Sequence, residues 1–227
     1  MSIKLSGDGK EILGGTKSAS LLVYDLVANR MATCVNMTHT DEINSVCFAN
    51  RMHSNIIFSG SDDGLVKVWD RRALNNNRPA GVFVGHHEGV ANVASKGDGI
   101  YLASNAKDQL LKIWDIRQAV EYGSLNYTSL PRRDPTFDYR YGAKYPKINK
   151  QEKHPDDYSV LTFKGHSVYS TLIRCQFSPI ETTGQRYVYT GSSDGNIHIY
   201  DLLTGDTAAT LRKDSTQAAA GSFDFFG

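Results

Sequence analysis

Four short segments of the chain end in the same way, with an apolar run followed by an aromatic residue and an aspartate. They are LLVYD at 21–25, VKVWD at 66–70, KIWD at 112–115 and HIYD at 198–201. The aromatic residues Tyr24, Trp69 and Trp114 stand 45 residues apart, and Tyr200 follows 86 residues later. A constant period of this size means that one supersecondary unit is repeated, and this constrains the fold more than composition does.

Polar residues recur at constant distances before three of these aromatic residues. An aspartate stands six residues before the aromatic residue, a hydroxyl residue stands four residues before that aspartate, and a histidine lies upstream in a polar loop. We expect each set to form a buried hydrogen-bond chain, because buried polar groups require partners. The three sets are His39, Ser59, Asp63 and Trp69; His86, Ser104, Asp108 and Trp114; and His166, Thr190, Asp194 and Tyr200.

The same residue types, serine, histidine and aspartate, also form the catalytic triad of hydrolases. Three copies in one register, each tied to a strand-ending Trp or Tyr, favour the structural interpretation. The sequence also has no phosphate-binding glycine loop, no metal-ligand spacing and no acid–base pair outside these sets. We therefore expect a protein that binds other proteins and is not an enzyme, with no catalytic residue, metal or cofactor.

The period of 40 to 45 residues ending in Trp-Asp resembles the WD repeat, whose copies form the blades of a β-propeller. The resemblance implies an all-β fold with about four blades of a seven-bladed ring, which is an incomplete arc. Such an arc exposes one apolar blade face at each end, so we expect it to be unstable alone, to associate, or to be completed by sequence outside this chain. The expected blades are 3–38, 39–84, 85–164 with an insertion at 118–158, and 165–212; the tail 213–227 is expected to be disordered.

Apolar runs bounded by Gly, Asp and Asn turns predict the strands. The first repeat is degraded, because Gly14 and Ser18 stand at its hydroxyl and aspartate positions and no histidine precedes it. Its innermost strand is expected near Ile3 to Ser6. The strands expected in the other repeats are 43–49, 55–60, 65–70 and 80–84; 90–95, 100–104 and 110–115; and 171–177, 186–191, 196–201 and 207–211.

Charge and cysteine content limit the partners and the compartment. The net charge of +1 is too small to favour nucleic acid or an anionic membrane. Basic residues alternate with aromatic ones in the insertion, as in proteins that bind single-stranded nucleic acid. The charges of its seven basic and six acidic residues nearly cancel, which argues against nucleic-acid binding. We expect instead that residues 135–148 dock on the propeller or on a partner. Cys47 and Cys175 lie in apolar runs typical of reduced core thiols, so we expect a cytoplasmic or nuclear protein.

Two repeats continue past Trp-Asp in the same way, as Trp69-Asp70-Arg71-Arg72 and Trp114-Asp115-Ile116-Arg117. This W-D-x-R pattern resembles that of WD-repeat proteins that dock onto the damage-specific DNA-binding protein, the adaptor of cullin-4 ubiquitin ligases. A guanidinium at the end of a blade strand is suited to bind carbonyls or carboxylates across an interface. The alternative is an arginine that pairs only within its own blade or covers apolar surface with its stem.

Longer stretches resemble one family of such proteins, the cullin-4-associated factor 11 family, also called WD repeat-containing protein 23. They are SKGDGIYLASNAKDQLLKIWDIR at 95–117, FDYRY at 137–141 and GHSVYSTLIRCQFSPIETTGQRYVYTGSSDGNIHIYDLLTG at 165–205. The resemblance extends from Ile3 to about Arg212. Family members also have an amino-terminal extension, earlier blades and a final blade, so this chain is interpreted as a truncated form.

The resemblance implies a substrate receptor of a cullin-4 RING ubiquitin ligase, which binds the adaptor and an unknown protein substrate. No small-molecule, nucleic-acid or membrane partner is expected. The residues implied at the adaptor-binding site are Trp69, Asp70, Arg72, Trp114, Asp115 and Arg117. The alternative is a WD-repeat scaffold of another multiprotein complex, because one fold serves many functions.

Overall fold

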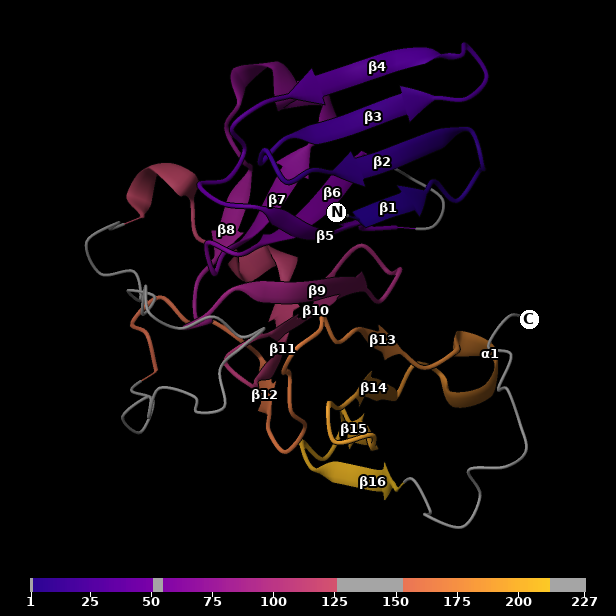
Figure 1. The fold of residues 1–227 in the computed structure, drawn as a ribbon, viewed down its shortest axis with the longest axis vertical. Coiled ribbons are helices and arrows are strands. Elements are labelled where there is room, and N and C mark those ends of the chain that lie inside the picture. The colour runs from indigo at the N-terminus through magenta and orange to yellow at the C-terminus, as the bar shows by residue number, and fades with distance from the viewer. Residues whose placement is uncertain (1, 51–54, 126–152, 213–227) are drawn as a thin grey trace.

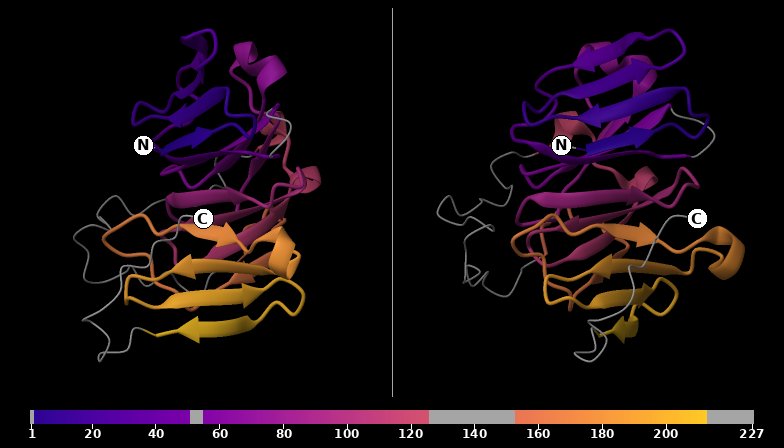
Figure 2. Two further views of the ribbon diagram at one scale, coloured as in Figure 1. Left: turned by 90° about the vertical axis from the view of Figure 1, so that its right-hand side faces the viewer. Right: turned by 45° about the vertical axis from the view of Figure 1, so that its right-hand side comes forward.

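The computed structural model describes residues 2–50, 55–125 and 153–212, and its fold is four antiparallel sheets of four strands each. The sheets follow one another around an arc, with the first and the fourth at its two ends (Figure 1). Two further views show the same succession of sheets (Figure 2). The fold class expected from the repeat is thus confirmed: the protein is an all-β propeller arc of four blades.

Each blade is a meander in which consecutive strands pair in sequence order. Within the described ranges, no helix has the length and apolar character needed to cross a bilayer. The first blade consists of β1 (Ser2–Leu5), β2 (Glu11–Gly15), β3 (Leu21–Asp25) and β4 (Arg30–Val35), and the second of β5 (Ile43–Phe48), β6 (Ile56–Ser61), β7 (Val66–Asp70) and β8 (Gly81–Phe83). The third consists of β9 (Val90–Ser95), β10 (Tyr101–Ala106), β11 (Leu111–Asp115) and β12 (Leu161–Phe163), and the fourth of β13 (Cys175–Phe177), β14 (Tyr187–Gly191), β15 (Ile197–Asp201) and β16 (Thr207–Leu211).

Short helical turns connect some of these strands. They are the 3₁₀ turns η1 (Arg71–Asn76), η2 (Ile116–Gln118) and η3 (Tyr122–Ser124), and the single α-turn α1 (Ile180–Thr183) between β13 and β14. The expected first strand of the fourth blade, 171–177, is shorter in the structure, where only Cys175–Phe177 pairs with β14. The third blade receives its fourth strand, β12, from beyond the insertion. Most of the insertion, residues 126–152, and the predicted tail 213–227 lie outside the described residues.

The core has three apolar layers, one at each junction between neighbouring blades, and a smaller buried cluster around Val82 and Leu125. Strand residues alternate between the two faces of a sheet, so each inner blade contributes one face to each of two layers. The layer between the second and third blades shows the pattern, with Phe58 and Val68 packed against Leu102 and Trp114. Corresponding layers lie at the first junction, around Leu13 and Trp69, and at the third, around Ile113 and Tyr200.

Among the described residues, the two end blades each have one sheet face without a neighbouring blade. Ile3 and Leu5 of β1 are 60% and 59% exposed. On the fourth blade, Tyr189, Ile197 and Leu211 are exposed at positions whose register matches buried Phe58, Val66 and Phe83 of the second blade. The described blades thus form an open arc, and the innermost strands of all four line a cavity of about 330 Å³ on its inner side.

One strand position differs between the junctions in a way that affects the site described below. Gly15, Gly60, Asn105 and Gly191 all pair with the first residue of the third strand of their blade. At Gly60 a Cβ atom would lie 2.7 Å from Val90 Cγ1, and at Gly15 it would lie 2.6 Å from Ile43 Cγ2. Glycine therefore permits the close approach of the next blade at the first two junctions, whereas the third junction has an asparagine side chain.

The cysteines do not form disulfides. Cys34 is exposed, and Cys47 and Cys175 are buried in the innermost strands β5 and β13. Burial raises the pKa of each buried thiol to about 12, so both are protonated at neutral pH.

Candidate protein-binding face

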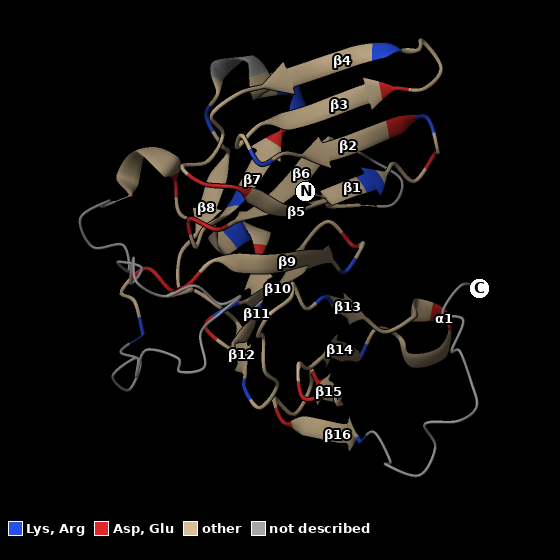
Figure 3. Ribbon diagram, viewed as in Figure 1, with Lys and Arg blue, Asp and Glu red and all other residues tan. Residues whose placement is uncertain are grey.

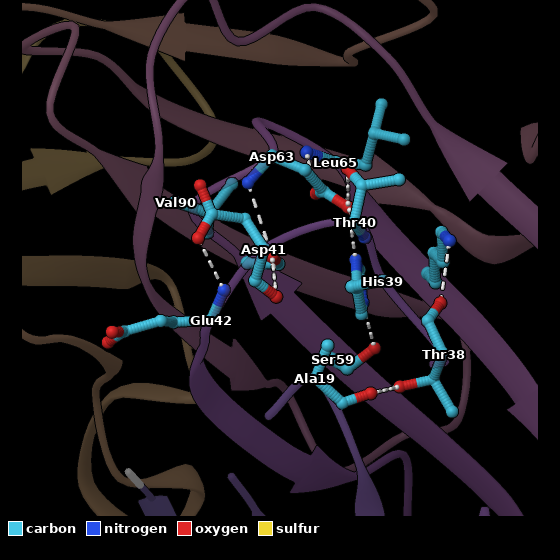
Figure 4. Close-up of polar contacts among 12 residues, drawn as sticks. Ala19, Thr38, His39, Thr40, Asp41, Glu42, Ser59, Asp63, Leu65 and Val90 are labelled. Carbon is cyan, nitrogen blue, oxygen red and sulfur yellow. Dashed lines mark hydrogen bonds and ion pairs between the residues drawn. The ribbon is translucent and has the colours of Figure 1, made fainter. Parts of the chain in front are cut away.

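The hydrogen-bond chain of the second blade joins four side chains that are far apart in the sequence. The indole Nε1 of Trp69 donates to Ser59 Oγ at 2.8 Å, and this hydroxyl lies 2.7 Å from His39 Nε2. His39 Nδ1 lies 2.8 Å from Asp63 Oδ2. Figure 4 shows the imidazole between the aspartate and the serine. Because only an imidazole N–H can donate to the carboxylate, the network assigns the proton of the neutral ring to Nδ1.

Electrostatics agree with this assignment. Burial is the largest influence on His39 and lowers its pKa, so the ring is neutral near pH 7. Burial would raise the pKa of Asp63, but hydrogen bonds from His39 and from the Leu65 backbone N–H hold it below its ordinary value. The aspartate thus remains a carboxylate that accepts bonds from the tight turn and from the imidazole.

The third blade repeats the chain with nearly the same geometry. Trp114 Nε1 donates to Ser104 Oγ at 2.7 Å, the hydroxyl lies 2.6 Å from His86 Nε2, and His86 Nδ1 lies 3.0 Å from Asp108 Oδ2. Asp108 also accepts from the backbone N–H groups of His87 and Leu110, each at 3.0 Å. All four side chains are buried, so the chain fixes the long loop before the blade to the turn between its second and third strands.

In the fourth blade the set predicted from the sequence does not assemble, and this prediction was wrong. Asp194 is exposed and accepts from the backbone and side chain of Asn196, within its own turn. His166 instead lies 3.0 Å from the Tyr200 hydroxyl through Nδ1 and 2.7 Å from Asn105 Oδ1 through Nε2. Thr190 accepts from Asn105 and donates to backbone carbonyls, rather than binding His166.

The physical reason lies at the junction with the third blade. Asn105 occupies the position where the earlier junctions have glycine, and its amide Nδ2 donates to Ile173 O and Thr190 Oγ1, both at 3.2 Å. Its Oδ1 then remains to accept from His166. The histidine that was expected to bind its own blade is therefore held by the preceding one, and Asp194 is left in solvent.

A second difference lies opposite the hydroxyl position. Lys67 pairs with Ser59 and donates to Thr38 O at 2.7 Å, and Lys112 pairs with Ser104 and contacts Asp157 Oδ2 at 2.7 Å. The corresponding residue of the fourth blade is His198. Its Nε2 is buried and has no hydrogen-bond partner among the described residues.

The residues of the two W-D-x-R motifs lie where the third strand of each blade ends. Arg72 donates from Nε at 2.9 Å and from Nη2 at 2.6 Å to the Asp70 carboxylate. Arg117 makes the same fork to Asp115, at 2.9 and 2.6 Å. The backbone N–H of each arginine also binds the carboxylate, so the motif closes into a local loop.

The arginines of these pairs are accessible although their aspartates are mostly covered. The side chains of Arg72 and Arg117 are 72% and 67% exposed, whereas those of Asp70 and Asp115 are 23% and 6% exposed. The side-chain hydrogen bond from each arginine lowers the pKa of its aspartate and the aspartate raises the pKa of the arginine. Trp69 and Trp114 are buried in the junctions and hold the strand ends rather than forming part of the exposed surface.

The fourth blade contains a third pair that sequence reasoning missed. Asp201 ends β15 and corresponds to Asp70 and Asp115, but Leu203 stands two residues further where they have an arginine. Arg186, which directly precedes β14, donates to Asp201 from Nε at 2.9 Å and from Nη2. The sequence signal for this pair was the Tyr200-Asp201 strand end and an arginine 15 residues before the aspartate. The two residues lie on neighbouring strands of a hairpin, and the sequence does not determine the register of that hairpin.

The first blade has the aspartate, but Val27 stands at the motif position of the arginine. Asp25 accepts from the backbone N–H groups of Val27 and Ala28, each at 2.9 Å, and Val27 is 75% exposed. Arg71, next to the motif arginine, makes a pair across the first junction with Glu11 at 2.6 and 2.7 Å. Charged residues gather at the strand ends and in the turns, as Figure 3 shows. The aspartates of the three pairs each end the third strand of their blade.

Comparison with known proteins identifies the class. The model of the family described as "WD domain, G-beta repeat" matches residues 32–70, 77–115 and 157–201. The chain therefore belongs to the WD-repeat family, in agreement with its four-stranded blades and their period.

Particular relatives narrow the comparison further. The chain is 49% identical over 212 residues to the LEC14B protein of Lithospermum erythrorhizon, covering 93% of this chain and 44% of that protein. It is 41% identical over 212 residues to the DDB1- and CUL4-associated factor 11 homolog of Caenorhabditis elegans, covering 92% of this chain and 36% of that protein. The chain thus spans less than half the length of the curated relatives it matches.

A solved structure supports the fold alone. A chain in the crystal structure of the mitotic checkpoint complex superposes with a TM-score of 0.64 at 19% sequence identity. The match covers 92% of this chain and 49% of that one.

Proposed function

We propose that this chain is a substrate receptor of a cullin-4 RING ubiquitin ligase and docks onto its adaptor through Arg72 and Arg117. The observation that carries the proposal is that two successive blades present the same exposed arginine, each held by an aspartate at the strand end. The adaptor is the damage-specific DNA-binding protein, DDB1. The chain would bring a protein substrate to a ligase that performs the chemistry, so it needs no catalytic residue of its own.

The fork geometry suits such a contact. Each arginine uses Nε and Nη2 for its aspartate, so the Nη1 amino group stays outside the pair. At Arg72 this group can donate to a partner, whereas the Arg117 side chain also has a hydrogen bond with Tyr101. The aspartate restricts the rotamers of a long side chain before binding, which reduces the entropy lost on association. As exposed ion pairs within a blade, the same contacts add little to stability.

The relatives add independent support. Two similar proteins, from Caenorhabditis elegans and Caenorhabditis briggsae, are named DDB1- and CUL4-associated factor 11 homologs, at 41% and 42% identity. Association with this ligase also suits a cytoplasmic or nuclear location, which fluorescence microscopy of the tagged chain would test.

The experiment is a pull-down of purified DDB1 by the chain and by its Arg72→Ala, Arg117→Ala double variant. A matched control, Lys164→Ala with Arg212→Ala, removes two positive charges from the opposite ends of the blades, because Lys164 follows β12 and Arg212 follows β16. Circular dichroism establishes that each protein is folded. We expect binding by the parent and the control, and loss of binding by the double variant.

Other outcomes contradict the proposal. If the folded parent does not bind DDB1, the function as a receptor through this face is wrong and a WD-repeat scaffold of another complex becomes the better interpretation. If the parent and the double variant bind equally, the chain meets the adaptor by another surface.

A further inference from the structure

The fourth blade reproduces, with residues from another part of the sequence, the surface feature on which the proposed function rests. Asp201 lies at the strand-end position of Asp70 and Asp115, as the registers Asp70↔Ile56, Asp115↔Tyr101 and Asp201↔Tyr187 show. Like those two aspartates, it accepts from the backbone N–H two residues further on, here Leu203 at 2.9 Å. Three consecutive blades therefore share the same carboxylate in the same setting.

The arginine reaches this carboxylate from the adjacent strand. In the second blade Arg71 N–H donates to Asn55 O, and in the fourth blade Leu202 N–H donates to Arg186 O, so Asn55 and Arg186 hold equivalent positions. Compared with the second blade, the fourth blade has an arginine in place of Asn55, just before the second strand, and a leucine in place of Arg72, after the third strand. The guanidinium still forks onto the aspartate through Nε and Nη2, as in the two motif pairs.

The third pair is also accessible. The Arg186 side chain is 44% exposed and its aspartate only 7%. The guanidinium lies over the Tyr187 ring, 5.3 Å from its centroid, which further limits its motion. Two apolar side chains near the same strand ends of this blade are exposed. They are Leu203, after β15, at 77% and Ile180, after β13, at 55%.

From this geometry we infer that Arg186, positioned by Asp201, is a third contact of the adaptor-binding surface, which then extends over three blades. The surface it meets on the partner supplies a carboxylate or backbone carbonyls for the guanidinium, and an apolar patch for Leu203. This inference rests on the proposed function, because it assigns a further residue to the same face. A row of three fixed guanidiniums also fits a rigid partner better than a single flexible charge does, since each pair is ordered before binding.

The test measures the affinity of purified DDB1 for the folded chain and three variants by biolayer interferometry. Arg186→Asn restores the residue type that the second blade has at this position, and we expect it to weaken binding roughly tenfold. Arg212→Ala removes one exposed charge from the opposite end of the same blade and should leave the affinity unchanged. Arg186→Asn combined with Leu203→Arg moves the arginine to the motif position of the other blades and should recover the affinity.

The thermal midpoint of each variant separates binding from structure. If Arg186→Asn lowers the midpoint, Arg186→Lys, which keeps a cation beside Asp201 without the guanidinium fork, takes its place and should still weaken binding. An unchanged affinity of the Arg186 variants, alongside loss of binding in the Arg72→Ala, Arg117→Ala variant, overturns this inference and leaves the proposed function standing. Absence of binding by the folded parent overturns both.

Discussion

The second, third and fourth blades each carry a histidine, a hydroxyl residue, an aspartate and an aromatic residue in the same order, yet they use them differently. In the second and third, a histidine connects a turn aspartate to a serine and a buried tryptophan within one blade. In the fourth, His166 lies between Tyr200 of its own blade and Asn105 of the blade before. The aspartate that completes the chain in the former is exposed in the latter.

The difference shows that a neighbouring blade can redirect a local motif. Where glycine lets two blades approach closely, nothing competes for the histidine and the within-blade chain forms. Where Asn105 projects into the junction, its amide satisfies the incoming loop and the imidazole together. As a consequence, the loop that carries His166 is bound to the third blade across the junction and not to the turn of its own blade.

The largest expected effect is that of removing the turn aspartate. Asp108→Ala leaves His86 Nδ1 and the N–H groups of His87 and Leu110 without their acceptor in a buried site, which should cost about 3–5 kcal/mol of unfolding free energy. Asp194→Ala, at the corresponding exposed position, should cost less than about 1 kcal/mol. Urea denaturation measures both, and similar losses from the two variants would break the comparison between the blades.

The second largest effect is expected in the pH dependence of stability that His166 causes. Burial, together with nearby His198, lowers the pKa of His166 to about 4 from an ordinary value of 6.5. Between these two pKa values the unfolded chain binds more protons than the folded one. The contribution of neutral His166 to the unfolding free energy, about 3 kcal/mol, is therefore fully present above pH 6.5 and is lost as the pH falls toward 4.

Nuclear magnetic resonance of the histidine ring protons provides the direct measurement of this titration. The His166→Gln variant should show a flatter decline of stability between pH 6.5 and 4, since it lacks this titrating ring. A His166 resonance that titrates near pH 6.5 in the folded protein would contradict the buried setting beside His198 described for it.

Close packing at the glycine junctions gives a smaller effect. Gly60→Ala places a Cβ atom 2.7 Å from Val90 Cγ1 and 2.8 Å from Val93 Cγ1, and should destabilise the protein by about 1–3 kcal/mol. Gly14→Ala is the matched control, because its Cβ would meet nothing closer than 3.8 Å in the same kind of strand. A Gly60→Ala protein as stable as the parent would show that the junction relaxes more easily than the packing indicates.

The smallest expected effect is the coupling between Asn105 and His166. A double-mutant cycle with Asn105→Ala and His166→Ala should give an interaction energy of about 1 kcal/mol, because the two side chains share a buried hydrogen bond of 2.7 Å. The same cycle with Asp194→Ala in place of Asn105→Ala should be additive. Coupling of His166 to Asp194 instead would restore the within-blade chain that the sequence predicted.

Much of the fold could be predicted because its signals are local and repeated. The strand-ending Trp-Asp and the alternation of apolar residues depend on neighbours a few positions apart, so the four blades and most strand bounds follow from them. Of the candidate binding face, the Asp70–Arg72 and Asp115–Arg117 pairs were foreseeable, since each joins residues two positions apart. The sequence alone also determined the hydrogen-bond chains of the second and third blades, where every partner belongs to one repeat.

The tertiary structure decided the partners that come from another strand or another blade. Asp201 meets Arg186 only through the pairing of β14 with β15, and His166 meets Asn105 only through the packing of the fourth blade on the third. The first contact depends on the register within a sheet, and the second depends on the junction between two sheets, where Asn105 stands in place of a glycine. The sequence of a repeat therefore determines the strands of its own blade. The packing at the junctions determines which polar side chains of that blade bind a neighbouring blade and which stay exposed.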